Sequence, residues 1–162
     1  MISKKPLLFK TIQGKKGTKV DITKFKIEDY QEKIDTMKKI CLESKGIGLA
    51  SVQIGLTEHL FIAKRDSSKE FEVFFNAEII ESSEENIITT EGCLSIPKVF
   101  LPVKRHRQVT IKWFDGFEER SEKLNEDFSI VVQHELSHLE GKTLFDLTTL
   151  NRQQKRDLLK RF

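Results

Sequence analysis

The sequence lacks any hydrophobic run that approaches the ~20 residues needed to cross a membrane. Its lysine-rich start also lacks the apolar stretch and the small-residue cleavage site of a secretory signal. The net charge is only +3, because 28 basic and 25 acidic residues are largely interleaved, and this argues against specific DNA binding. We therefore expect a cytoplasmic protein that makes no contact with a membrane.

Repeats, low-complexity tracts and linkers are missing too, so the 162 residues predict a single domain over positions 1–162. Cysteine is scarce, with two residues in the chain. A reducing compartment argues against a disulfide between them. Cys41 falls on the apolar side of a predicted helix and is interpreted as a core residue, whereas Cys93 is available for another role.

A pair of histidines in residues 133–138 is the most informative feature that is present. His134 and His138 stand four positions apart, so on a helix they share a face and can hold one metal ion, while Glu135 reaches the water bound to it. The alternative is a surface helix that happens to carry two histidines. The largely apolar residues 128–132, which would bury such a helix, favour the metal site of a hydrolase.

A metal site of this kind needs a third protein ligand, which peptidases with this motif usually take downstream from a glutamate or a histidine. Neither type follows Glu140, and Asp146 and Asp157 are the remaining downstream carboxylates. Upstream, Cys93 offers a thiolate in the short segment 91–97 and is the favoured third ligand. Three protein ligands leave a fourth position for water, whose pKa falls toward ~7 beside a divalent ion.

Three segments, residues 46–55, 91–97 and 133–138, resemble the motifs of the peptide deformylase family and follow one another in that family's order. The resemblance covers roughly residues 26–150. It implies a hydrolase that removes the N-formyl group from N-formylmethionyl nascent peptides. It also implies one divalent metal ion, Fe(II) in the cell, with Zn(II), Ni(II) or cobalt able to occupy the site.

The resemblance assigns roles to individual residues. It implies that the side-chain amide of Gln53 and the backbone N–H of Leu94 bind the oxyanion of the reaction, while the position of Glu135 beside the metal-bound water already indicates a general base. The peptide backbone is expected to lie along residues 46–48 as an added strand. The expected substrate-binding residues are Gly46, Ile47 and Gly48 along this strand, and Ile130, Val131 and the stem of Glu91 around the methionine side chain.

Several positions depart from the family pattern. Thr89 and Asp127 align with apolar residues of the family's pocket, and Ser51 stands where alanine is usual. Thr89 and Asp127, together with Ser137, leave open a deformylase-like protein with a shifted substrate or reduced activity. An unrelated metallopeptidase with the same two-histidine motif is a further alternative.

Ser137 is the most consequential departure, because family members usually carry an aspartate there that pairs with the arginine found here as Arg105. Both residues, with Gln133, are expected to surround the metal ligands. A buried and unpaired Arg105 would destabilise the protein by about 3–5 kcal/mol. We therefore expect Arg105 to reach solvent, another carboxylate or water, and Ser137 to hydrogen-bond to a carbonyl one turn back on its helix.

The hydrophobic periodicity, together with the resemblance, predicts an α+β fold of antiparallel sheets around a central metal-binding helix. Helices are expected at about 27–44, 126–139 and 151–162. Strands are expected at 59–63, 71–75, 79–80, 87–88 and 109–114. The last helix is basic and is a candidate for contact with ribosomal RNA, the alternative being a solvated terminal helix.

Overall fold

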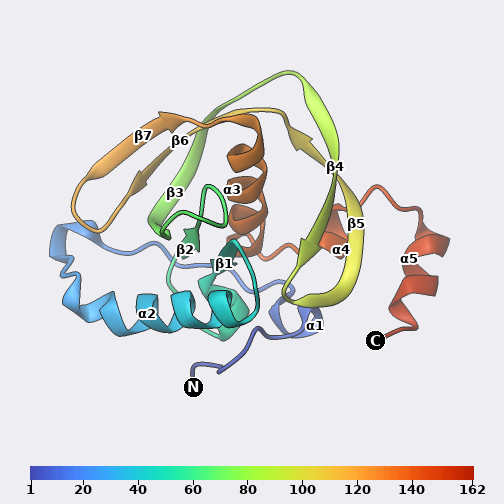
Figure 1. Cartoon of the computed structure of the whole chain (residues 1–162), viewed down its shortest axis with the longest axis horizontal. Helices are drawn as coiled ribbons and strands as arrows, with labels where there is room; N and C mark the ends of the chain where they lie inside the picture. Colours follow the sequence, from blue (N-terminus) through green and yellow to red (C-terminus); the bar gives the residue numbers. More distant parts are fainter.

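The computed structural model describes all 162 residues and arranges two antiparallel sheets around one central helix (Figure 1). This helix is α3 (Glu126–Leu139). The larger sheet has the strand order β1-β2-β3-β6-β7, with bounds Gly48–Ala50, Leu60–Ala63, Glu72–Ser82, Val109–Phe114 and Glu119–Lys123. The smaller sheet pairs β4 (Asn86–Cys93) with β5 (Ile96–His106). The predicted fold class is confirmed.

Strand β2 is apolar throughout because both of its faces are covered. Phe61 and Ala63 belong to the core cluster that includes the apolar face of α3, whereas Leu60 and Ile62 belong to the cluster on the opposite face. Helix α2 (Glu28–Glu43) supplies that second cluster, in which Cys41 is fully buried, as predicted. The two helices therefore sandwich the β1-β2-β3 part of the larger sheet.

Both ends of helix α3 carry residue types that are typical of helix termini. The side chain of Asn125 accepts a hydrogen bond of 2.8 Å from the N–H of Phe128 at the first turn. Gly141 follows the last turn with φ of +82°, a conformation that favours glycine. Phe128 and Leu136 face the core, so the histidine face of the helix is turned toward β4.

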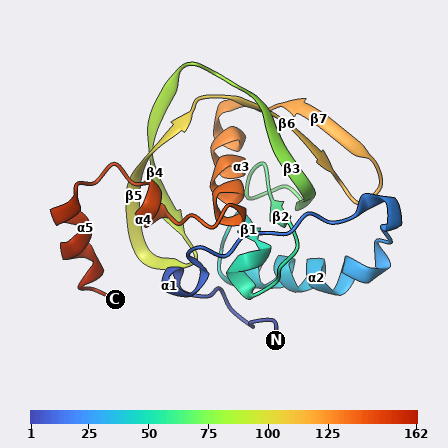
Figure 2. The ribbon, with the colours of Figure 1, turned by 180° about the vertical axis from the view of Figure 1, so that it is seen from behind.

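The short helices α1 (Phe9–Ile12) and α4 (Leu144–Leu147) pack against β5, where the rings of Phe9 and Phe145 lie 4.5 Å apart. Figure 2 shows α4 beside β5 and the last helix, α5 (Arg152–Leu159), at the outer edge of the molecule. No helix of the structure has the length and apolar character of a membrane span.

The expected helices at 27–44, 126–139 and 151–162 are all present, whereas the strand predictions needed correction, and β1 was not predicted as a strand. The segments predicted at 71–75 and 79–80 form the single strand β3, whose register against β6 shifts at two places. Strand β5 was not predicted, because Pro97 and Pro102 weaken its signal, yet an outer strand tolerates proline. Strand β7 was not predicted either, because its residues are almost all charged.

Candidate metal centre

Three potential metal ligands meet where α3 faces the end of β4. The Nε2 atoms of His134 and His138 are 3.2 Å apart, and Sγ of Cys93 lies 3.3 Å from Nε2 of His138. The three ligand atoms lie within 4.8 Å of one another. The downstream aspartates are engaged elsewhere, because Asp146 accepts from the N–H of Thr143 and Asp157 pairs with Lys160.

This donor set fits one divalent ion. Two nitrogen ligands at about 2.0–2.1 Å from a tetrahedral centre lie roughly 3.3 Å apart, close to the separation of the two histidine nitrogens. Nδ1 of His134 lies 2.9 Å from Oε1 of Glu91, and a hydrogen bond donated to this carboxylate leaves Nε2 with a free lone pair. One thiolate and two imidazoles suit a transition metal better than Mg²⁺ or Ca²⁺.

Glu91 is the centre of a buried hydrogen-bond network behind His134. Its carboxylate accepts from Nε and Nη2 of Arg105 at 2.9 Å each, and from the hydroxyl of Thr89 at 2.8 Å. The side chains of Glu91 and Arg105 are only 7% and 6% exposed. Burial by itself raises the pKa of Glu91, but the hydrogen bonds from His134 and Arg105 outweigh it and bring this pKa to about 2.

The expectation for Arg105 and Ser137 is confirmed. Arg105 stays buried and pairs with another carboxylate, that of Glu91. Nη1 of Arg105 also donates to Oγ of Ser137 at 2.9 Å, and Ser137 donates to the carbonyl of Gln133, one turn back on α3, at 2.7 Å. The side chain of Gln133 in turn bonds to both the N–H and the carbonyl of His106, which fastens α3 to β5.

Glu135 lies within the cavity beside the ligands, and its Oε2 has no hydrogen-bond partner in the protein. Burial raises the pKa of Glu135 to about 7, in the range where a carboxylate can both take up and release a proton near neutrality. Gly48 makes room for it, because a Cβ at this position would collide with the carboxylate. Gly48 was predicted to contact the peptide, and its closeness to Glu135 is a second reason for glycine at this position.

The two candidate oxyanion donors lie beside Cys93. Nε2 of Gln53 is 3.6 Å from Sγ of Cys93 and donates to Oγ of Ser95 at 3.1 Å. The carbonyl oxygen of the same side chain accepts from the N–H of Ala50 at 2.9 Å, which orients the amide. The backbone N–H of Leu94 has no partner among the protein's own groups, so it is available to a substrate oxygen.

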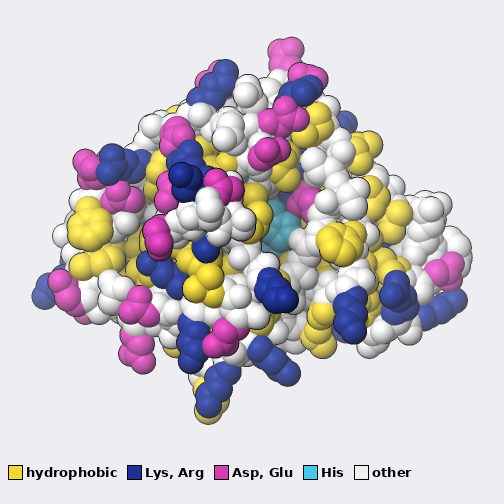
Figure 3. All heavy atoms as spheres, in the orientation of Figure 1, with side chains coloured by type: hydrophobic (Ala, Val, Ile, Leu, Met, Phe, Trp, Pro, Cys, Tyr) yellow, Lys and Arg dark blue, Asp and Glu magenta, His cyan; other side chains and the backbone are white.

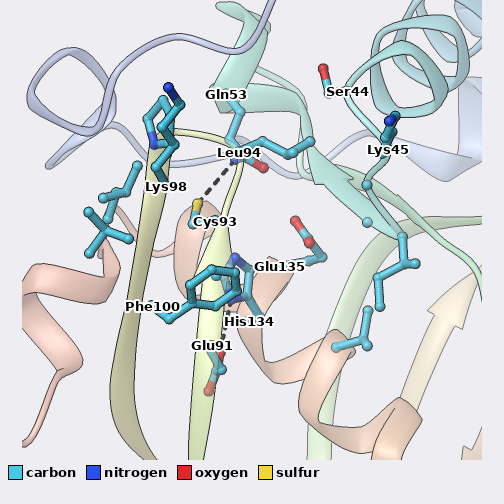
Figure 4. A pocket seen from close by; sticks show the side chains of 18 of the residues that line it. Ser44, Lys45, Gln53, Glu91, Cys93, Leu94, Lys98, Phe100, His134 and Glu135 are labelled. Carbon is cyan, nitrogen blue, oxygen red and sulfur yellow. Dashed lines mark hydrogen bonds and ion pairs between the residues drawn. The ribbon is translucent and has the colours of Figure 1, made fainter.

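The ligands open into a cavity of about 650 Å³. Figure 3 shows it as a hollow with a histidine side chain at its floor, and Figure 4 shows the labelled side chains around it. All the predicted substrate-binding residues line this cavity: Gly46, Ile47, Gly48, Glu91, Ile130 and Val131. Thr89 and Asp127 do not line it, although they align with residues of the family's pocket. Thr89 turns to Glu91 instead, and Asp127 is exposed in the first turn of α3.

Comparison with known proteins agrees with this geometry. The family model described as "Polypeptide deformylase" matches residues 14–155. The chain belongs to the peptide deformylase family. Members are metallohydrolases, and the chain is accordingly a hydrolase that removes the N-formyl group from nascent peptides.

Individual deformylases are similar over most of their length. The chain is 37% identical over 154 residues to the peptide deformylase of Pseudothermotoga lettingae. The aligned residues make up 94% of this chain and 86% of that protein. Among solved structures, the peptide deformylase of Legionella pneumophila has a TM-score of 0.83 at 30% identity and covers 100% of this chain and 95% of its own. The Thermotoga maritima deformylase has a TM-score of 0.82 at 27% identity, with coverages of 93% and 100%.

Residues of the N-terminal segment, which had no predicted role, contact the loops of the candidate metal centre. The N–H of Leu7 donates to the carbonyl of Gln53 at 2.7 Å, and the N–H of Phe9 donates to that of Ser95 at 2.9 Å. The N-terminal segment therefore holds the two loops that carry the candidate oxyanion donors, although it lies outside the part that resembled the family. Ser51 is buried and donates to the carbonyl of Glu58 at 2.6 Å, so this departure is satisfied locally.

Proposed function

We propose that residues 1–162 act as one catalytic domain that cleaves N-formylmethionyl peptides at a divalent ion held by Cys93, His134 and His138. The observation that carries the proposal is the approach of these three ligand atoms to within 4.8 Å, at a cavity that also holds Glu135. Action on nascent chains implies a cytoplasmic location.

The roles of the side chains follow from their positions. A divalent ion bound here would lower the pKa of a water molecule toward ~7 and polarise the formyl oxygen. Glu135 would take the proton of that water and return it to the leaving amine. Nε2 of Gln53 and the N–H of Leu94 would donate to the oxyanion, each donor stabilising the transition state by about 3–4 kcal/mol. Glu91 would keep His134 in the tautomer that presents Nε2.

The peptide would lie between two free strand edges. Strand β1 pairs only with β2, and β4 pairs only with β5, so each has an edge without a strand partner. An extended peptide adds to such an edge through backbone hydrogen bonds. Ile130 and Val131 line the cavity from α3 and would contact the methionine side chain.

For the metal in the cell we propose Fe(II), with Zn(II) and Ni(II) fitting the same ligands. The thiolate of Cys93 and ferrous iron are both oxidisable, so the iron enzyme should lose activity in air. Cleavage of formyl-Met-Ala-Ser by iron-loaded and zinc-loaded protein, under anaerobic conditions and then in air, tests this choice. An iron-loaded enzyme no more active than the zinc-loaded one would refute it.

A contact of α5 with ribosomal RNA is proposed as well. No residue of α5 is buried. The basic side chains of the segment are Arg152, Lys155, Arg156, Lys160 and Arg161. Cosedimentation with ribosomes at low and moderate salt, before and after deletion of residues 151–162, is the test. Binding through this segment should weaken with salt and with the deletion, and binding indifferent to both would rule the contact out.

A further inference from the structure

Two unpaired lysines line the mouth of the cavity from different elements. Lys45 follows α2 and Lys98 lies in β5, and Figure 4 shows them on opposite sides of Cys93 and Glu135. Both residues are exposed, and the ammonium group of neither makes a hydrogen bond or an ion pair within the protein. The acidic residues that line the cavity, Glu91 and Glu135, are buried. The exposed charge at the mouth is therefore positive.

The backbone makes the choice of lysine at these positions unusual. The angle φ is +56° at Lys45 and +60° at Lys98, and Asn76 is the only other non-glycine residue with a positive φ. Residues with a Cβ rarely adopt this left-handed backbone conformation, whereas glycine does so without steric conflict. Lys45 also follows Ser44, the C-cap of α2, at a position where helices commonly have glycine. Because conformation alone favours glycine at both positions, the charged side chains point to a role outside the backbone.

We propose that Lys45 and Lys98 form a cationic mouth that selects formylmethionyl peptides with acidic side chains after the methionine. This inference rests on the proposed function, because it requires the peptide to leave the metal ligands between the edges of β1 and β4. Lys45 directly precedes the segment 46–48 at β1, and Lys98 follows the turn that ends β4, so the departing chain passes both ammonium groups. One exposed ion pair between a lysine of the mouth and an acidic side chain of the peptide changes the affinity for the peptide by about two- to fivefold.

The test compares kcat/KM for two peptides on the metal-loaded enzyme. The peptides are formyl-Met-Asp-Asp-Ala and formyl-Met-Lys-Lys-Ala, both amidated so that no terminal carboxylate reaches the lysines. At low salt the acidic peptide should be cleaved about tenfold more efficiently than the basic one, because two lysines attract one peptide and repel the other. The preference should shrink at 1 M salt, where the screening length falls to about 3 Å. Equal efficiency for the two peptides at low salt would overturn the proposal.

Substitutions assign the preference to the two lysines. The double variant Lys45→Gln, Lys98→Gln should cleave both peptides with nearly equal efficiency. Lys104→Gln is the matched control, since Lys104 is an exposed, unpaired lysine of β5 that does not line the cavity, and it should keep the wild-type preference. A double Gln variant that keeps the wild-type preference would contradict the assignment.

Glycine variants separate the charge from the backbone. Lys45→Gly and Lys98→Gly should each reduce the preference as the corresponding Gln substitution does, while thermal stability stays equal or rises because glycine relieves the positive φ. A glycine variant that retains the full preference would refute the role of that lysine. Cleavage of formyl-Met-Ala-Ser amide, which carries no charge, distinguishes failure of the proposed function from failure of the cationic mouth. If the wild-type enzyme does not cleave this neutral peptide, the proposed function fails, whereas its cleavage without any charge preference refutes only the cationic mouth.

Discussion

Replacement of Ser137 by aspartate tests how the residues around the ligands set metal retention. Oγ of Ser137 lies 2.9 Å from Nη1 of Arg105, so a carboxylate at this position would meet the guanidinium with little movement. Arg105 is already paired with Glu91, so an aspartate at position 137 would place a second carboxylate against the same guanidinium. An added negative charge in this cluster should therefore favour a bound cation.

The magnitude follows from the bond that changes. The hydrogen bond from the guanidinium of Arg105 to Ser137 is already charge-assisted, and an ionised acceptor strengthens it further, so Ser137→Asp should stabilise the metal-loaded protein by about 1 kcal/mol. Changes among groups that orient metal ligands typically alter metal affinity ten- to a hundredfold. Because Glu91 already holds both Arg105 and His134, we expect the lower end, about a tenfold slower loss of metal.

The assay is metal release to a chelator and thermal unfolding, measured in a double-mutant cycle. In the Arg105→Ala background, Ser137→Asp should help little or destabilise, because Glu91 and the new aspartate are then buried without a cation. Arg105→Lys serves as a second background in which the positive charge remains but the bidentate hydrogen bonding to Glu91 is lost. If Ser137→Asp has the same effect with Arg105 present and absent, the two positions are not coupled and the reasoning is wrong.

Three further predictions concern the proposed catalytic groups. Cys93→Ser should lose most of its bound metal, whereas Cys41→Ser should keep it and lose only stability; equal metal content in wild type and Cys93→Ser would remove Cys93 from the ligands. Gln53→Ala should lower kcat about 10²- to 10³-fold with metal retained, and a change of only a few-fold would exclude its role as an oxyanion donor. In the metal-free protein, burial raises the pKa of Glu135 from 4.5 to about 7, so ionisation destabilises the fold progressively between these pH values. The free energy of unfolding, from chemical denaturation, should therefore rise in Glu135→Gln relative to wild type as the pH increases. The difference between the two proteins should be about 3 kcal/mol larger at pH 8 than at pH 4.5, and a difference that does not depend on pH would refute the raised pKa.

The extent of α3 and its two candidate metal-ligand histidines could be predicted from the sequence because their signals are local. The cap at Asn125, the glycine at position 141 and the four-residue spacing of His134 and His138 all act within a few turns of the chain. The family motifs likewise placed Cys93 and Gln53 in short segments. Strand β5 escaped prediction because Pro97 and Pro102 mask a pairing that only its partner strand reveals.

The network around Glu91 could not be predicted, because it depends on strand register. Arg105 lies opposite Ile87 in the β4-β5 pair, which puts it on the same sheet face as Thr89 and Glu91 at alternate positions of β4. Sequence patterns do not fix that register. Thr89 was therefore interpreted as a change in the substrate pocket, although its hydroxyl supports the carboxylate that holds His134.

The most direct test of the account measures formate release and metal content together for wild type and Glu135→Gln, loaded with iron under anaerobic conditions. We predict about one metal ion per chain in both proteins, cleavage of formyl-Met-Ala-Ser by the wild type, and a loss of about two to four orders of magnitude in turnover for the variant. Turnover of Glu135→Gln within a few-fold of wild type, at equal metal content, would contradict the assignment of Glu135 as the base and with it the proposed mechanism.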